Sequence, residues 1–148
     1  MPEEGQPKKV LVITAHPDDS EFGSAGSIAL WTSQGWEVNC VVCTNGNKGS
    51  QDPEMNMEKL ASIREVEQRN ASNVLGVKDV VFLGYGDGEL EESRDFLRNV
   101  VRQIRRFRPD LVITSDPYRR YAWHRDHRVC GRVVLDAEVV AIRRAGNR

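Results

Sequence analysis

Short apolar runs alternate with longer segments of helical period along the whole chain. Runs rich in β-branched residues predict strands at Val10–Thr14, Glu37–Thr44, Asp79–Leu83 and Leu111–Thr114. The spacing of apolar residues between and after them predicts helices at Phe22–Gln34, Pro53–Leu75, Ser93–Phe107 and Asp126–Ala145. Such alternation favours parallel strands, and continuous apolar strands favour a sheet covered on both faces. The predicted fold class is α/β, a Rossmann-like, doubly wound, mainly parallel sheet with helices on both faces.

All three histidines of the chain lie in the loops that follow the first and fourth predicted strands. The first loop reads AHPDDSE and contains His16, and the second reads SDPYRRYAWHRDH and contains His124 and His127. A doubly wound sheet binds its ligands beyond the carboxyl ends of the strands, where the winding direction reverses. If the fourth strand returns beside the first, that reversal lies between these two loops. We therefore expect the histidines and their neighbouring aspartates to form one site.

Length and composition indicate an ordinary globular domain. The 148 residues correspond to one domain, residues 1–148, and the contents of 39% hydrophobic and 29% charged residues are typical. A net charge of -1 gives no broad attraction to nucleic acid or to acidic membranes. The chain has no apolar run of bilayer-spanning length, and its start, MPEEGQPKK, lacks the apolar segment of a secretion signal. We expect a cytoplasmic protein without nucleic-acid or membrane partners.

The cysteines give no disulfide framework. The chain contains three of them, and Cys40 and Cys43 form a C-x-x-C within the predicted strand WEVNCVVCT. Residues three apart on a strand face opposite sides of the sheet, so these two thiols are poorly placed to pair or to share a metal. We interpret them as small buried hydrophobic residues.

His16, Asp19 and His127 are the predicted metal ligands. Pro17 stiffens the turn after His16, so the imidazole of His16 and the carboxylate of Asp19 can point to one place. His127 supplies a third ligand from the other loop. Two histidines and one carboxylate are typical of catalytic zinc, because the fourth coordination position remains open for water.

Three further side chains are predicted to take part in catalysis. Asp18 is adjacent to a ligand but points elsewhere, and a carboxylate near metal-activated water is a natural general base. His124 can hydrogen-bond an oxyanion or return a proton to a leaving amine. Asp126 can orient His124 or another imidazole, although it could equally cap the last helix.

The segment AHPDDSEFGSAGS, followed much later by HRDH, resembles the PIG-L/LmbE family of zinc-dependent N-deacetylases, which act mainly on N-acetylglucosaminyl compounds. TNGNKGS, IREVEQRNASNVLGV, LGYGDGEL and RPDLVITSDP also resemble the family's order of elements. The resemblance implies a Zn²⁺ cofactor, and it implies the same roles for the six loop residues, with Asp126 tuning His124.

The resemblance also implies that Arg64 and Asp87 bind substrate. Considered without it, Arg64 could instead pair with Glu67 one turn along its helix, and Asp87 could be a plain turn residue in YGDG. The chain departs from the family pattern at Ser20, where an acidic residue is frequent, and at Arg125, which replaces a usual proline. Neither departure removes a proposed ligand.

The function implied is zinc-dependent removal of the N-acetyl group from an N-acetylglucosamine-containing small molecule or glycoconjugate. Members of the family usually continue well beyond a helix like GRVVLDAEVVAIRRAGNR, so the chain is expected to lack the family's C-terminal portion. Two alternatives follow: a truncated fragment that binds zinc without catalysis, or a site completed by another chain, for example in a homo-oligomer. A magnesium-dependent phosphotransferase and a nucleotide-binding module are less consistent with the imidazole-rich loops.

Overall fold

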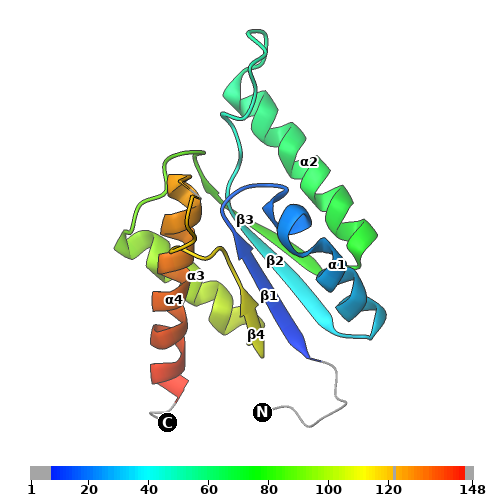
Figure 1. Cartoon of the computed structure of the whole chain (residues 1–148), viewed down its shortest axis with the longest axis vertical. Helices are drawn as coiled ribbons and strands as arrows, with labels where there is room; N and C mark the ends of the chain where they lie inside the picture. The colour runs from blue at the N-terminus through cyan, green and yellow to red at the C-terminus, as the bar shows by residue number, and fades with distance from the viewer. Residues whose placement is uncertain (1–7, 122, 146–148) are drawn as a thin grey trace.

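The computed structural model describes residues 8–121 and 123–145. Within them, strands and helices alternate as shown in Figure 1, in the order β1 (Lys9–Thr14), α1 (Asp19–Ser33), β2 (Glu37–Thr44), α2 (Met57–Leu75), β3 (Asp79–Tyr85), α3 (Arg94–Phe107), β4 (Leu111–Ile113) and α4 (Arg125–Ala145). The predicted alternation is confirmed, and every predicted strand coincides with an observed strand to within two residues at either end.

Two helices begin three or four residues from their predicted starts, because local hydrogen bonds decide where the first turn forms. α1 begins at Asp19 and not at Phe22, since the carbonyl oxygen of Asp18 already accepts the backbone N–H of Phe22 at 3.1 Å. α2 begins after Asn56 and not at Pro53, since the Asn56 side chain caps its first turn. One start depends on a backbone bond to Asp18 and the other on a side-chain cap by Asn56, and apolar periodicity reveals neither.

The sheet is parallel, with the strand order β3-β2-β1-β4. β1 lies in the middle and pairs with both β2 and β4, so that Val10 is the partner of Val38 on one side and of Leu111 on the other. The fourth strand therefore returns beside the first, which is the condition on which the predicted convergence of the two loops depended. This order brings the loops after β1 and β4 to the same end of the sheet.

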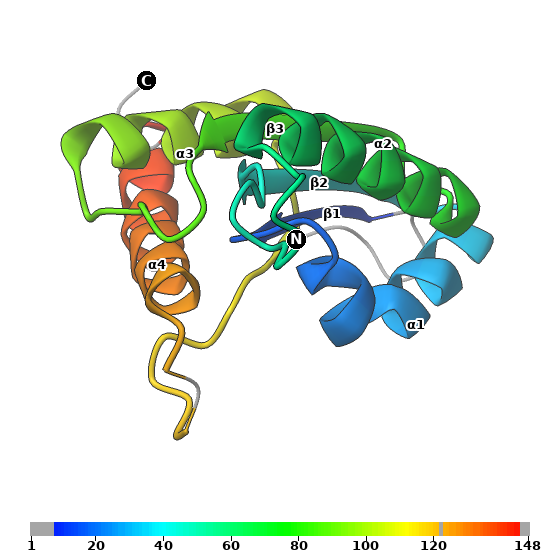
Figure 2. The ribbon, with the colours of Figure 1, turned by 90° about the horizontal axis from the view of Figure 1, so that it is seen from above.

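Helices cover both faces of the sheet. In Figure 2, α1 and α2 lie on one side of the strands, and α3 and α4 lie on the other. Alternate residues of β1 enter separate hydrophobic clusters, because successive side chains of a strand point to opposite faces. Val10 and Val12 pack with Ile28 of α1. Leu11 and Ile13 pack with α3 and α4, mainly against Phe96, Val100, Val129, Cys130 and Val133.

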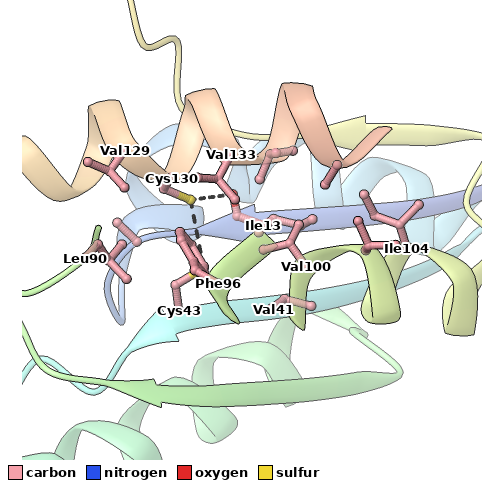
Figure 3. Close-up of a cluster of buried hydrophobic side chains, with 14 of the residues drawn as sticks. Ile13, Val41, Cys43, Leu90, Phe96, Val100, Ile104, Val129, Cys130 and Val133 are labelled. Atoms are coloured by element: carbon pink, nitrogen blue, oxygen red, sulfur yellow. Dashed lines mark hydrogen bonds between the residues drawn. The ribbon is translucent and has the colours of Figure 1, made fainter. Parts of the chain in front are cut away.

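The two cysteines of the C-x-x-C face opposite sides of the sheet, as predicted. Cys40 belongs to the cluster under α1, and Cys43 belongs to the cluster under α3 and α4. Figure 3 shows Cys43 below Cys130, and their sulfur atoms are 3.9 Å apart. All three thiols are buried, and burial raises the pKa of Cys40 to about 12. They fill space in the core as small hydrophobic side chains.

β4 forms one edge of the sheet and is the shortest of its strands, with three residues. Its first residue, Leu111, is 40% exposed.

None of the described helices combines the length and the apolar character needed to cross a bilayer.

Gly131 allows α4 to lie directly against the segment that follows β4. A Cβ atom at this position would collide with the carbonyl oxygen of Ser115 and would lie 2.9 Å from Cδ of Pro117. By contrast, a Cβ atom at Gly26, which lies on α1, would meet no atom within 4 Å. The close approach at Gly131 fixes the distance between α4 and the loop that precedes it.

We expect Gly131→Ala to lower the free energy of unfolding by about 1–3 kcal/mol, because backbone and proline atoms must move to admit the methyl group. Gly26→Ala is the matched control, and it should raise stability by up to about 1 kcal/mol through helix propensity alone. Urea unfolding followed by circular dichroism measures both. Equal stabilities of the two variants would contradict the close packing inferred at Gly131.

Candidate functional site

A tight turn after β1 carries three of the predicted residues. Asp18 adopts a left-handed backbone conformation, with φ 76°, which aspartate tolerates better than most residues. The chain therefore reverses directly from β1 into α1. The carboxylate of Asp19 accepts the backbone N–H of His16 at 2.9 Å, which closes the turn. His16 and Asp19 are thus held on the same side, at the carboxyl end of the sheet.

The beginning of α4 brings His127 to this turn. Its Nε2 atom lies 3.0 Å from Oδ2 of Asp19 and 3.1 Å from Nδ1 of His16. Nδ1 of His16 and Oδ2 of Asp19 are 3.5 Å apart. The two loops predicted to converge therefore do meet, although His16 and His127 are 111 residues apart in the sequence. They meet through three potential ligand atoms, Nδ1 of His16, Oδ2 of Asp19 and Nε2 of His127.

These three atoms fit a divalent zinc ion. A tetrahedral zinc ion with bonds of about 2.0–2.2 Å separates its ligand atoms by about 3.3–3.6 Å. The observed separations of 3.0, 3.1 and 3.5 Å need only small adjustments. Two imidazole nitrogens and one carboxylate oxygen also match zinc in ligand type. Three protein ligands leave one position open, as in catalytic zinc sites.

Electrostatics keeps Asp19 ionised and ready for a cation, whereas His16 holds a proton that a metal ion would have to displace. Burial alone would raise the pKa of Asp19, but hydrogen bonds from His127 and His16 hold that pKa well below its usual range. Burial alone would lower the pKa of His16, but hydrogen bonds with Asp19 and Asp126 outweigh it and raise the pKa to about 9. Asp19 is therefore ionised. A metal ion on Nδ1 of His16 would release a proton from that ring, as is usual for histidine ligands.

Asp126 lies behind the cluster and holds His16, and not His124, through its carboxylate. Its Oδ2 atom is 2.8 Å from Nε2 of His16 and accepts the backbone N–H of Gly88 at 2.7 Å. Its Oδ1 atom accepts the backbone N–H of Leu90 at 3.2 Å. A carboxylate behind a metal-binding histidine fixes the orientation of the ring and makes it a stronger ligand. The sequence allowed two interpretations of Asp126, a partner of an imidazole or a cap of the last helix. The position of its carboxylate favours the first, with His16 as the imidazole.

The side chain of Asp18 is held from α2. Arg64 donates from Nη2 to the Asp18 carboxylate at 3.0 Å and to the carbonyl oxygen of Pro17 at 2.9 Å. Within the described residues Arg64 thus pairs with Asp18 and not with Glu67. Burial raises the pKa of Asp18 and Arg64 lowers it, with a net upward shift. The result is an accessible carboxylate, beside the proposed ligands, with an increased affinity for protons.

Asp87 and His124 complete the rim of an open cavity. Oδ1 of Asp87 lies 3.2 Å from Nε2 of His16, and the backbone N–H of Asp87 is held by Asn47. The ring of His124 packs edge-on against that of His16, with centroids 4.6 Å apart. The cavity, of about 250 Å³, is lined by seven of the eight predicted residues together with Gly46; these are His16, Asp18, Asp19, Arg64, Asp87, His124 and His127. Asp126 is the eighth and is fully buried behind them.

Gln68 is a residue of the site that the sequence did not predict. Its side-chain oxygen accepts the backbone N–H of Asp18 at 2.7 Å, and its amide nitrogen donates to Glu21 and Ser72. Gln68 is 3% exposed. It lies one helical turn after Arg64, so α2 holds the backbone of Asp18 as well as its side chain. The only sequence signal was this four-residue spacing, which is common on helices.

We expect Gln68→Leu to lower the free energy of unfolding by about 1–3 kcal/mol, because the N–H of Asp18 then loses its partner in a partly buried position. Ser72→Ala is the control, since it removes a contact of Gln68 without touching Asp18. Chemical denaturation of both variants tests this role. A loss in Gln68→Leu no larger than that in Ser72→Ala would show that the bond to Asp18 contributes nothing.

We expect His16→Ala to reduce zinc affinity by at least about 100-fold, because it removes a ligand and leaves the carboxylate of Asp126 without its ring partner. His124→Ala should still retain one zinc ion per chain. Elemental analysis after dialysis, with circular dichroism as a check on folding, measures both. Full zinc occupancy in His16→Ala would exclude His16 from the ligand set.

Known proteins resemble this chain over most of its length. Diacetylchitobiose deacetylase of Thermococcus kodakarensis is 38% identical over 130 residues, which cover 88% of this chain and 49% of that protein. The probable N-acetyl-alpha-D-glucosaminyl L-malate deacetylase 2 of Bacillus anthracis is 36% identical, over 88% of this chain and 59% of that protein. The chain therefore spans about half the length of these curated relatives.

Solved structures show the same fold. N,N'-diacetylchitobiose deacetylase from Pyrococcus horikoshii matches 89% of this chain, and 49% of its own, with a TM-score of 0.88 and 36% identity. GalB, the 4-carboxy-2-hydroxymuconate hydratase from Pseudomonas putida KT2440, matches 90% of this chain, and 57% of its own, with a TM-score of 0.82 and 27% identity. Residues 11–138 match the family described as "PIG-L: GlcNAc-PI de-N-acetylase", so the chain belongs to the PIG-L family.

Proposed function

We propose that this chain carries the site of a zinc-dependent hydrolase that removes the N-acetyl group from an N-acetylglucosamine-containing molecule. The observation that carries the proposal is the triangle of ligand atoms from His16, Asp19 and His127, with the carboxylate of Asp18 on the same cavity. Relatives that are 36–38% identical and carry deacetylase names support this reaction.

Zinc bound to His16, Asp19 and His127 would polarise the acetyl carbonyl and lower the pKa of a coordinated water to about 7. The chain's own contribution begins with Asp126, which keeps the ring of His16 in a fixed orientation through a 2.8 Å hydrogen bond. That contact also keeps Nδ1 of His16 directed at Asp19 and His127. Ligand positions set in advance reduce the reorganisation needed during the reaction.

Asp18 acts as the general base in this proposal. Its carboxylate is 55% exposed at the cavity, which lets water approach it, while Arg64 fixes one of its oxygens. The upward shift of its pKa favours taking a proton from the attacking water. The water oxygen then bonds to the acetyl carbon, and negative charge develops on the acetyl oxygen. The C–N bond breaks as the carbonyl re-forms, the amine takes up the proton held by Asp18, and acetate is released.

His124 stabilises the negative charge that develops on the acetyl oxygen. Its Nδ1 atom accepts the backbone N–H of Asp126 at 3.2 Å, so the ring proton of a neutral His124 lies on Nε2. Nε2–H can therefore donate to the oxyanion without a charge on the ring. Loss of one such donor in other enzymes costs about 3–4 kcal/mol of transition-state stabilisation.

Arg64 and Asp87 are the proposed contacts to the sugar, because both line the cavity from the side of α2 and the loop after β3. A second hollow, of about 490 Å³, adjoins the first, and both are lined by Asp19 and His127. Room on both sides of the ligands supports a substrate larger than the monosaccharide, such as a disaccharide or a conjugate of N-acetylglucosamine.

The test is release of acetate from N-acetylglucosamine, its disaccharide, and its inositol, malate and glycopeptide conjugates. Turnover by the zinc-loaded chain supports the proposal. One bound zinc ion without any acetate release would favour the alternative of a chain that binds zinc but is inactive. Hydration of 4-carboxy-2-hydroxymuconate, run in parallel, tests whether the site resembles GalB in its chemistry.

We expect Asp18→Asn to retain zinc and to lose acetate release by about 100- to 10,000-fold, because the amide cannot accept the proton of water. The substitution preserves shape and still accepts a hydrogen bond from Arg64. Asp79→Asn, which alters an exposed carboxylate paired with Arg106 at the start of β3, is the control and should keep the parental rate. Parental turnover by Asp18→Asn would require another base.

A further inference from the structure

A groove of about 500 Å³ lies between α2 and β3, and the reaction proposed above makes no use of it. β3 is the edge strand on the side of the sheet away from β4, and α2 packs against it (Figure 1). The walls of the groove come from α2, from β3 and from the loop after β2. Among the described residues, none lines both this groove and the cavity of the proposed zinc ligands.

The groove and the cavity nevertheless share a wall. Gly46 and Arg64 line the cavity. Their neighbours in the chain, Asn45, Asn47 and Glu65, line the groove. A Cβ atom at Gly46 would be 3.5 Å from the guanidinium carbon of Arg64, so the loop after β2 lies directly on the Arg64 side chain. A ligand that extends from the cavity past this wall therefore reaches the groove.

Two asparagine side chains offer hydrogen-bond donors at the groove. The side-chain oxygen of Asn45 accepts the backbone N–H of Asn47 at 3.2 Å, and that of Asn47 accepts the backbone N–H of Asp87 at 3.1 Å. These bonds determine which end of each amide is the nitrogen. In the described part of the chain, neither NH₂ group donates to another residue. Both are therefore available to the oxygen atoms of a ligand.

The acceptors of the groove include two carboxylates, and no described lysine, arginine or histidine lines it. Glu58 and Glu65 line it from α2, with Ser62 between them. Glu65 is paired with Arg69 at 2.9 Å, whereas Glu58 forms no ion pair with a described residue. The groove therefore carries negative charge, which repels a phosphate or a carboxylate on a ligand.

Apolar surface in the groove comes mainly from one aromatic ring. Phe82 of β3 lines it, and the guanidinium of Arg69 lies 5.0 Å from the centroid of that ring. Met57, which is 56% exposed, adds a flexible apolar side chain. Gly84 also lines the groove, and a Cβ atom there would meet no atom within 4 Å, so the space beside it is open. Apolar surface beside amide donors and carboxylate acceptors suits a sugar ring, whose hydroxyl groups both donate and accept hydrogen bonds.

We propose that this groove is a subsite for an uncharged second sugar ring, attached to the N-acetylglucosamine unit in the cavity. The inference rests on the proposed function, because the groove extends a substrate site only if the cavity holds that unit. Phe82 packs against the second ring, Asn45 and Asn47 donate to its oxygen atoms, and Glu58 accepts from its hydroxyl groups. Of the candidate substrates above, the neutral disaccharide fits the groove, and the malate conjugate, with its carboxylates, does not.

The test is calorimetric titration of the whole zinc-loaded chain carrying Asp18→Asn, so that turnover does not consume the ligand. N,N'-diacetylchitobiose should bind about tenfold more tightly than N-acetylglucosamine, which is the ratio expected if the second ring makes good contacts. Ser62→Trp fills the groove from an exposed position and should reduce this ratio to about twofold or less. Val74→Trp, at an 87% exposed position near the end of the same helix, is the matched control and should keep the full ratio.

A charged ring tests the chemistry of the groove. A disaccharide of N-acetylglucosamine and glucuronic acid has a similar size but carries a carboxylate, so it should bind no more tightly than the monosaccharide. Glu58→Arg should raise the affinity for this acidic disaccharide by about threefold, because a cation then replaces the repelling carboxylate at the surface. Equal affinities for the neutral and the acidic disaccharide, with Glu58 in place, would overturn the proposed preference for an uncharged ring.

The outcomes separate this inference from the proposed function. Equal affinities for the monosaccharide and the neutral disaccharide would overturn the subsite and leave the deacetylase proposal standing. A preference for the disaccharide that Ser62→Trp leaves intact would also overturn it, since the second ring would then bind elsewhere. A preference that Ser62→Trp removes, without acetate release by the zinc-loaded parental chain, would support the subsite and refute the proposed reaction.

Discussion

The buried carboxylate of Asp126 is the interaction on which the arrangement of the site depends. It is fully buried, and burial of a charge is costly unless hydrogen bonds satisfy it. Two backbone N–H groups of the turn after β3 and the ring of His16 after β1 satisfy it here. One side chain of α4 thereby joins three segments that are far apart in sequence. Movement of any of them would leave a charged group without its partners.

Most of the architecture could be predicted from the sequence because it follows from repeating patterns. Apolar periodicity predicted the alternation of strands and helices, and that alternation indicated a parallel sheet, whereas the strand order was known only from the structure. The convergence of His16 with His127 was then a consequence of topology, since the carboxyl ends of neighbouring parallel strands lie together. Cys40 and Cys43 were likewise assigned to opposite faces from the two-residue period of a strand alone.

The finer contacts of the site could not be predicted, because they depend on distances between segments and not on patterns within them. Asp126 is 110 residues from His16, and no local feature distinguishes a partner of that ring from a helix cap. Gln68 is 50 residues from Asp18, and a glutamine on a helix is ordinarily exposed. The resemblance to the PIG-L/LmbE family suggested Arg64, but its partner Asp18 became apparent only in three dimensions.

One of the three proposed ligands, His127, and the proposed base, Asp18, are attached to different layers of the protein. Arg64 and Gln68 hold Asp18 from α2, whereas His127 belongs to α4 on the other face of the sheet (Figure 2). A slight sliding of one helical layer relative to the other would alter the gap between the ion and the carboxylate that takes its proton. The rigidity of the four-stranded sheet therefore sets the tolerance of the chemistry, even though no strand contributes a reacting group.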